Sequence, residues 1–200
     1  MGMPKVVDHE KRRREIGEAV WRAVARRGMD SATVREIADE AGVSTGVLAH
    51  YFEDKDELLV HALRVSVERA AKRMEGQSAG RSNFEALGTV LKEALPLDGE
   101  SRDEYRVWLS FWGRAAYSGA LAAEQNHWYT LWRGVVAALI EACQREGVLR
   151  ADLDARREAS TLIALVDGIG LQAIFEPERL PADDQEAAID ERLASLKTNS

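Results

Sequence analysis

Residues 33–52 carry short polar side chains and small residues in a spacing suited to nucleic-acid contact. A helix-turn-helix needs a small residue where two short helices cross and a glycine in the turn, and Ala38 and Gly42 meet these needs. The hydroxyls of Thr33 and Ser44 can cap the two helices. The outward positions of the second helix are small or hydrogen-bonding, so this helix can approach a major groove closely. The segment therefore predicts a DNA-binding helix-turn-helix.

The rest of the chain must hold this motif in place, and its pattern is helical throughout. The four prolines lie at candidate boundaries, and no alternating strand pattern occurs. The predicted fold class is all-α: an N-terminal three-helix helix-turn-helix DNA-binding domain followed by a helical ligand-binding and dimerisation domain, with about nine helices. These helices are expected near residues 8–28 (capped by Asp8), 33–41, 45–51, 55–74, 83–95, 101–117, 120–146, 154–175 and 184–197.

Composition and charge indicate how the chain is divided. Residues 75–83 are rich in Gly, Ser and other polar residues, which is typical of a linker. We expect residues 1–54 to bind DNA, residues 55–80 to form a connecting helix and linker, and residues 81–200 to bind ligand and dimerise. Residues 1–74 carry a net charge of +1 and residues 75–200 a net charge of −8, so any DNA contact must come from the N-terminal part. Its basic run at residues 11–14 fits either a solvated helix end or a DNA-flanking role.

Several function classes are disfavoured. No uninterrupted apolar run approaches the roughly 18 residues that span a bilayer, and the N-terminal segment is charged, so we expect a cytoplasmic protein with no membrane partner. The single cysteine, Cys143, is insufficient for a disulfide framework or a cysteine metal site. The four histidines lack metal spacing, and neither a phosphate loop nor a nucleophile elbow occurs. We expect no enzyme activity, no metal and no cofactor.

The helix-turn-helix residues resemble a known family. Residues 44–52 (Ser-Thr-Gly-Val-Leu-Ala-His-Tyr-Phe), followed by residues 54–59 (Asp-Lys-Asp-Glu-Leu-Leu), resemble the recognition helix and the start of the fourth helix of the TetR family. Residues 166–172 and 177–181 resemble the C-terminal domain of its BetI-like branch. The chain departs from many members at Ala49, where a tyrosine hydroxyl would bind a phosphate. The resemblance implies a ligand-responsive transcriptional regulator, a repressor that a small-molecule inducer releases from its operator.

The resemblance also implies which residues contact double-stranded DNA. The candidates are Thr33, Arg35, Ser44, Thr45, Gly46, His50, Tyr51 and Lys55. Thr45, Gly46 and His50 are expected at base edges or thymine methyl groups. Tyr51 and Lys55, like the two capping hydroxyls, are expected at phosphates. The alternative is that the hydroxyls only cap helices and that the rings only pack the small domain.

An aromatic cluster in the second half is the candidate ligand site. Its members are Trp108, Phe111, Trp112, Trp128 and Trp132. The tryptophans form two pairs four residues apart, so each pair shares a helix face and two facing pairs would bracket a flat or cationic guest. Ordinary core packing is the alternative. With Glu104 or Glu124 nearby the site would suit an amine, whereas an all-apolar cavity would suit a lipophilic acid or drug.

Wide apolar stripes on the later helices predict a homodimer. The candidate interface residues are Val135, Leu139, Leu162, Val166, Ile169 and Gly170. Gly168 and Gly170 lower helix propensity, a loss more easily understood if another helix packs closely there. Two recognition helices held about 34–36 Å apart would bind a near-palindromic operator. The alternative function is a helical dimeric ligand carrier or adaptor that does not bind DNA.

Overall fold

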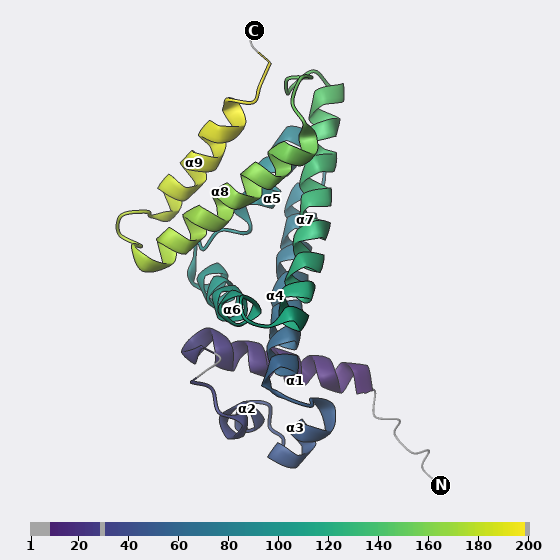
Figure 1. Cartoon of the computed structure of the whole chain (residues 1–200). Coiled ribbons are helices and arrows are strands. Elements are labelled where there is room, and N and C mark those ends of the chain that lie inside the picture. Colours follow the sequence, from purple (N-terminus) through teal and green to yellow (C-terminus); the bar gives the residue numbers. More distant parts are fainter. Residues whose placement is uncertain (1–8, 29–30, 199–200) are drawn as a thin grey trace. The chain divides into compact units, whose positions relative to one another are not determined.

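A computed structural model describes residues 9–28 and 31–198, and within these ranges the chain forms nine helices (Figure 1). They are α1 (His9–Arg27), α2 (Val34–Glu40), α3 (Thr45–Tyr51), α4 (Lys55–Ser78), α5 (Asn83–Lys92), α6 (Gly99–Ala115), α7 (Gly119–Arg145), α8 (Ala155–Phe175) and α9 (Ala182–Ala194). The predicted all-α fold is confirmed. The largest difference in bounds is at the end of α4, which continues to Ser78. The predicted cap at Asp8 lies outside the described residues.

Polar caps begin the two helices of the predicted motif. Thr33 and Glu36 form a capping box, in which the Glu36 N–H donates to Thr33 Oγ1 (3.2 Å) and the Thr33 N–H donates to the Glu36 carboxylate (2.9 Å). Ser44 Oγ accepts a hydrogen bond from the Val47 N–H (3.2 Å). These bonds satisfy backbone groups that a helix leaves unpaired at its start. Local sequence therefore determines where α2 and α3 begin.

Contacts group the chain into two units. The N-terminal unit comprises Met1–Glu68 with Arg106–Leu121, and the C-terminal unit comprises Arg69–Tyr105 with Ala122–Ser200. This grouping differs from the expected ranges 1–54, 55–80 and 81–200. The continuous helix α4 is shared between the two units, and the second half of α6 groups with the N-terminal residues.

In the N-terminal unit α2 packs on both α1 and α3, and Figure 1 shows α2 and α3 on the same side of α1. Ile16, Ile37 and Leu48 are fully buried and supply apolar side chains from all three helices. Trp21 Nε1 donates to Ser66 Oγ (2.7 Å), and both side chains are buried. This bond ties α1 to α4 in the interior of the unit.

In the C-terminal unit α5, α8 and α9 pack on one another (Figure 1). By length and composition alone, α8 is apolar enough to cross a membrane. Core helices of soluble proteins pass the same test, and one such helix is weak evidence for a span. Leu162, Ile163 and Val166 of α8 are buried within the unit. We therefore interpret α8 as the core helix around which this unit is built.

Candidate nucleic-acid interface and ligand-binding region

The turn between α2 and α3 has the geometry that a helix-turn-helix requires. Gly42 adopts a φ of +62°, a left-handed conformation that glycine accepts without strain. The Val43 N–H donates to the Ala38 carbonyl oxygen (2.9 Å), which closes the end of α2. Ala38 and Leu48 are each 1% exposed. The small residue, the glycine and the apolar anchor therefore have the positions that the sequence predicted for them.

The candidate DNA-contacting residues lie together at the surface of this motif. Thr33, Arg35, Ser44, Thr45, Gly46 and His50 are exposed, and Tyr51 and Lys55 are half-buried. The rings of His50 and Tyr51 meet edge to face, with centroids 5.5 Å apart. At the position where the sequence departs from the family, Ala49 is also exposed. The outer surface of α3 is thus composed of small and hydrogen-bonding groups, as a helix that enters a groove requires.

Ion pairs from α1 neutralise two acids of α2, Glu36 and Glu40. Arg22 Nε and Glu40 Oε1 lie 2.8 Å apart, and Arg26 also pairs with Glu40. Arg27 pairs with Glu36. The hydrogen bond from Arg22 is the largest effect that lowers the pKa of Glu40. Two carboxylates that would repel a phosphate backbone are thereby compensated within the unit.

Arg13 of α1 connects the end of α3 to the start of α4, a role that the sequence reasoning missed. Its Nε donates to His61 Nε2 (2.9 Å), and its guanidinium pairs with Glu57. The guanidinium carbon lies 5.3 Å from the centre of the Phe52 ring. Phe52 directly follows α3 and meets the His61 ring edge-on at 5.0 Å. The cluster therefore fixes the recognition helix against α1 and α4.

The predicted aromatic site is divided between the two units. Trp108, Phe111 and Trp112 on α6 group with the N-terminal unit, and Phe111 is fully buried. Trp128 and Trp132 on α7 group with the C-terminal unit. Trp128 Nε1 donates to Glu124 Oε1 (3.1 Å), so this candidate acid already has a donor.

The second candidate acid, Glu104, is also engaged. Its side chain is 1% exposed, and its carboxylate accepts from Arg73 Nη1 (2.9 Å) and Nη2 (2.7 Å). The bidentate bond with Glu104 is the largest effect that raises the pKa of Arg73. Glu93 pairs with the same guanidinium at 2.9 Å. The charge of Glu104 is therefore already neutralised by Arg73, which it shares with Glu93.

A carboxylate that the sequence reasoning did not single out lies among aromatic side chains of the C-terminal unit. Asp167 of α8 accepts a hydrogen bond from the Tyr129 hydroxyl at 2.6 Å. The Tyr105 hydroxyl donates to the backbone oxygen of the same residue (2.8 Å). Burial raises the pKa of Asp167 to about 6, against the opposing effects of the Tyr129 hydrogen bond and the Arg133 charge. In the sequence, Asp167 is the one charged residue in the apolar part of α8, and this pattern could have indicated it.

The predicted dimer residues have different environments. Leu162, Val166, Ile169 and Gly170 are buried within the protomer and offer almost no surface to a second copy. Their apolar character is explained by packing inside the C-terminal unit, where α8 contacts α5 and α9. Leu139 is half-buried and Val135 is 51% exposed.

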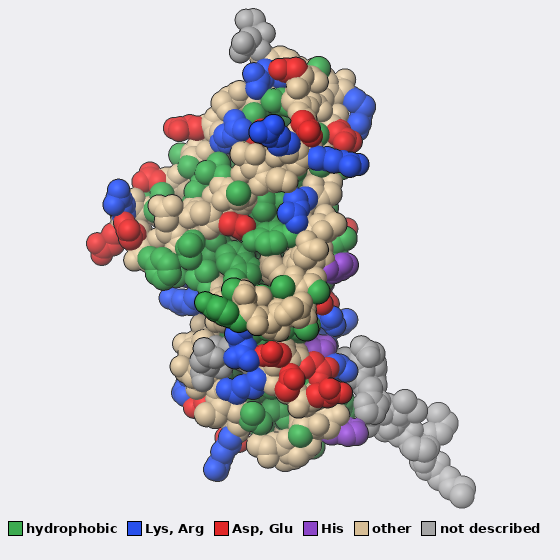
Figure 2. All heavy atoms as spheres, viewed as in Figure 1, with side chains coloured by type: hydrophobic (Ala, Val, Ile, Leu, Met, Phe, Trp, Pro, Cys, Tyr) green, Lys and Arg blue, Asp and Glu red, His purple; other side chains and the backbone are tan. Residues whose placement is uncertain are grey.

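Exposed apolar side chains lie elsewhere on α8. Phe175 is 71% exposed and Leu171 is 38% exposed. Figure 2 shows hydrophobic side chains gathered on the viewed face over the C-terminal half of this helix. Gly168 shares that face, and apart from the neighbouring backbone of its own helix no atom of the described residues lies within 4 Å of where its Cβ would be. This surface is available to another molecule, whereas the buried face of α8 is not.

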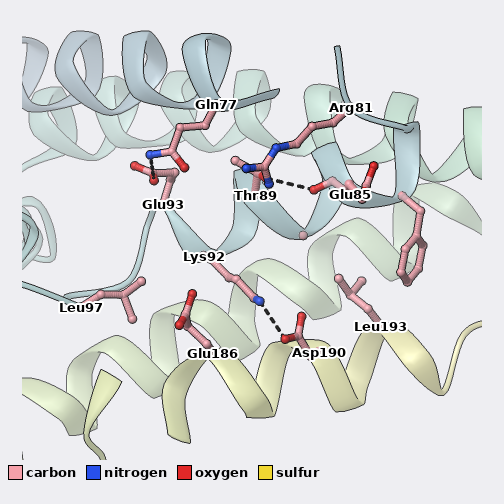
Figure 3. Close-up of a pocket in the computed structure, with 12 residues that line it drawn as sticks. Gln77, Arg81, Glu85, Thr89, Lys92, Glu93, Leu97, Glu186, Asp190 and Leu193 are labelled. Atoms are coloured by element: carbon pink, nitrogen blue, oxygen red, sulfur yellow. Dashed lines mark hydrogen bonds and ion pairs between the residues drawn. The ribbon is translucent and has the colours of Figure 1, made fainter. Parts of the chain in front are cut away.

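A groove of about 380 Å³ lies between α5 and α9 (Figure 3). Lys92 Nζ donates to Asp190 Oδ2 across it (2.7 Å), and Arg81 Nη1 donates to Thr89 Oγ1 (3.0 Å). Much of its polar lining is thus satisfied by its own residues. Among the residues that the structure describes, no group of three His, Cys, Asp or Glu side chains could hold a metal ion.

Comparison with known proteins identifies both halves of the chain. Residues 16–62 match the family described as bacterial regulatory proteins, tetR family, and residues 84–197 match the family described as BetI-type transcriptional repressor, C-terminal. The chain is 36% identical over 197 residues to the HTH-type transcriptional regulator PksA of Bacillus subtilis (strain 168), covering 97% of this chain and 94% of PksA. It is 32% identical to BetI 2 of Chromohalobacter salexigens, covering 90% and 86% of the two chains. A putative regulator of Saccharomonospora viridis, solved in complex with choline, is 30% identical with a TM-score of 0.86, covering 96% of this chain and 100% of that one.

Proposed function

Because the chain belongs to the TetR family of transcriptional regulators and carries a BetI-type C-terminal domain, we propose that it is a homodimeric repressor that a small-molecule inducer releases from its operator. The observation that carries the proposal is the exposed, small and polar surface of α3, which α2 and the Arg13 cluster hold in place. Family membership favours this function over a carrier that does not bind DNA.

The DNA contacts of this proposal follow from side-chain chemistry. Thr45, Gly46 and His50 of α3 contact base edges, because small residues let the helix approach and an imidazole can donate or accept a hydrogen bond. Tyr51 and Lys55 contact phosphates, as do the hydroxyls that begin α2 and α3. Two copies of α3 spaced about 34–36 Å apart then recognise a near-palindromic operator in the cytoplasm.

The second copy packs on the exposed face of α8. Phe175 and Leu171 supply apolar area, and Gly168 allows a close approach of helix backbones. A symmetric interface of this kind buries the same face on both copies. It replaces the buried residues of α8 that the sequence pattern had suggested.

The inducer binds in the C-terminal unit and shifts the dimer toward a conformation with a different spacing of the two α3 helices. The choline complex of the Saccharomonospora viridis relative supports a small organic ligand for a domain of this type. A ligand can shift the equilibrium only by its differential affinity for the two conformations. A coupling of about 1–3 kcal/mol lowers operator affinity by roughly 5- to 150-fold.

The proposal is tested by gel-shift titration of the full-length protein against the DNA upstream of its own gene. We expect binding that weakens steeply as the salt concentration rises, because phosphate contacts release counterions. His50→Ala should lose operator affinity and keep the oligomeric state. His127→Ala changes an exposed histidine of α7 in the other unit and serves as the matched control. Equal operator binding by the two variants would exclude His50 as a DNA contact, and no salt-sensitive binding by the wild type would refute the proposal.

A further inference from the structure

Val47 of α3 is an apolar side chain on a surface whose other groups are small or hydrogen-bonding. It is 39% exposed, whereas its neighbour Leu48 is 1% exposed and fills the core position of the helix. Between residues 31 and 55, all of which the structure describes, the only other exposed large hydrophobic side chain is Val34 (40%) at the start of α2. Single exposed apolar residues are common on proteins, so exposure alone assigns no role. The position on α3 distinguishes Val47 from such residues.

Val47 lies in the first turn of α3, and the N-terminal residues of a recognition helix are those that meet base edges in a major groove. Its N–H donates to Ser44 Oγ (3.2 Å), so the helix cap fixes its backbone. A β-branched side chain in a helix has one strongly preferred rotamer. The two methyl groups of Val47 are therefore oriented before DNA binds.

The neighbours of Val47 leave room for a base to reach it. Gly46 has no side chain. Apart from its chain neighbours and the backbone of its own helix, the one described atom within 4 Å of a Cβ at that position is Ser44 Oγ (3.8 Å). Ala49 is exposed and carries only a methyl group. His50 follows three residues after Val47, so the two side chains share a helix face. A helix with this surface can approach a groove closely enough for Val47 to touch a base edge.

Resting on the proposed function, we propose that Val47 is a specificity-determining residue that recognises the C5 methyl group of a thymine in the operator. A valine side chain has no hydrogen-bonding group, so it cannot read the donors and acceptors of a base edge. The thymine methyl group is the apolar feature that the four bases present in the major groove. Contact between this methyl group and Val47 removes apolar surface of both from water, which no other base at that position can match.

The helix geometry also places this thymine relative to the base that His50 contacts. Side chains three residues apart on a helix have Cβ atoms about 5–6 Å apart. Successive bases of one strand lie about 3.4 Å apart along the duplex axis. The thymine is therefore expected within about two base pairs of the His50 contact. The two-fold symmetry of the dimer repeats the same contact in the second half-site.

Uracil substitution tests the proposal, because uracil lacks only the methyl group and keeps the base pair and its hydrogen-bonding edge. Gel-shift titrations of the full-length protein compare the duplex upstream of its gene with duplexes that carry uracil at one symmetric pair of thymine positions at a time. At one such pair we expect wild-type affinity to fall by about 15-fold, which is about fourfold for each half-site.

Two valine truncations show which side chain is responsible for this effect. Val47→Ala removes both methyl groups from an exposed position and favours the helix, so the variant should fold normally. It should bind the unsubstituted duplex more weakly than the wild type and lose most of the uracil effect at that pair of positions. Val34→Ala makes the same change at an equally exposed valine of α2 and is the matched control. Its uracil effect should equal that of the wild type.

Three results would overturn the methyl contact. They are equal binding of every uracil-substituted duplex by the wild type, an undiminished uracil effect in Val47→Ala, and an equal loss of the effect in Val34→Ala. The first result together with weaker binding by Val47→Ala would mean that Val47 touches the sugar–phosphate backbone and carries no sequence information.

Binding of the unsubstituted duplex by the wild type tests the regulator proposal separately. If salt-sensitive binding occurs and the uracil effect is absent, the regulator proposal stands and only the thymine contact is lost. If no salt-sensitive binding occurs, the regulator proposal fails on its own account and the thymine contact fails with it.

Discussion

The ring of Tyr105 occupies the space that a side chain at Gly170 would need. A Cβ on Gly170 would lie 2.3 Å from Tyr105 Cε2 and 2.7 Å from its hydroxyl oxygen. The same hydroxyl donates to the Asp167 backbone oxygen (2.8 Å), so the ring is held against α8 by a bond as well as by shape. The absence of a side chain at Gly170 therefore allows the Tyr105 ring to pack closely against α8 within one protomer.

Replacing Gly170 by alanine should destabilise the C-terminal unit. The added methyl group forces the fully buried Tyr105 ring or the α8 backbone to move, which costs about 1–3 kcal/mol of unfolding free energy. Chemical denaturation measures the change. Gly113→Ala is the control, because no atom of the described residues outside the neighbouring backbone of α6 lies within 4 Å of its Cβ position. This variant should gain up to about 1 kcal/mol of unfolding free energy. Equal stability of the two variants would contradict the close approach.

Asp167 should make the ligand-free protein less stable as pH rises from about 4 to about 6. Burial holds its folded pKa at about 6, above the value of roughly 3.9 in an unfolded chain, so the folded state binds the proton more tightly. The stability that this proton confers is complete below the unfolded pKa and is lost as pH rises through the folded pKa. The unfolding free energy of the wild type minus that of Asp167→Asn should fall by about 2–3 kcal/mol over this range. A difference that is flat or rises with pH would refute the burial of the charge.

Most of the helix boundaries could be predicted from local patterns in the sequence. Thr33, Ser44 and Gly42 act on neighbouring backbone groups, so their effect on helix starts and turns can be predicted without knowing the tertiary structure. Helical periodicity likewise identifies which side of a helix is apolar. The positions of α2 and α3, and with them the exposed surface of α3, follow from such local rules.

Interactions between distant segments could not be predicted in the same way. Periodicity shows that Leu162, Val166 and Ile169 form an apolar stripe, but it does not show whether their partner belongs to the same chain. Arg13 and His61 are brought together only when α1 packs on α4. The pairing of Asp167 with Tyr129 likewise depends on the rotation of α7 and α8 about their axes, which no single-helix pattern determines.

The bond between Arg13 and His61 should support operator binding. His61 Nε2 accepts from Arg13 Nε at 2.9 Å, so this nitrogen carries no proton in the folded state. His61→Leu removes the acceptor and should lower unfolding free energy by about 1 kcal/mol and weaken operator binding. In His61→Gln the amide oxygen can accept the same bond, so both losses should be smaller. Thermal unfolding measures the loss of stability and gel-shift titration measures the loss of operator affinity. Identical results for the two variants would show that the Arg13–His61 bond contributes to neither.

Dimerisation through the exposed face of α8 can be separated from dimerisation through α7 with two matched charge substitutions. Phe175→Glu places a carboxylate where a symmetric partner would bury a side chain that is 71% exposed in the protomer, so it should dissociate the dimer. Leu131→Glu makes the same change on α7 at a position that is 50% exposed and should leave the dimer intact. Sedimentation equilibrium gives the oligomeric state, and gel-shift titration should show that the monomeric variant loses operator affinity because it binds one half-site only. If Leu131→Glu yields monomers and Phe175→Glu does not, the interface lies on α7.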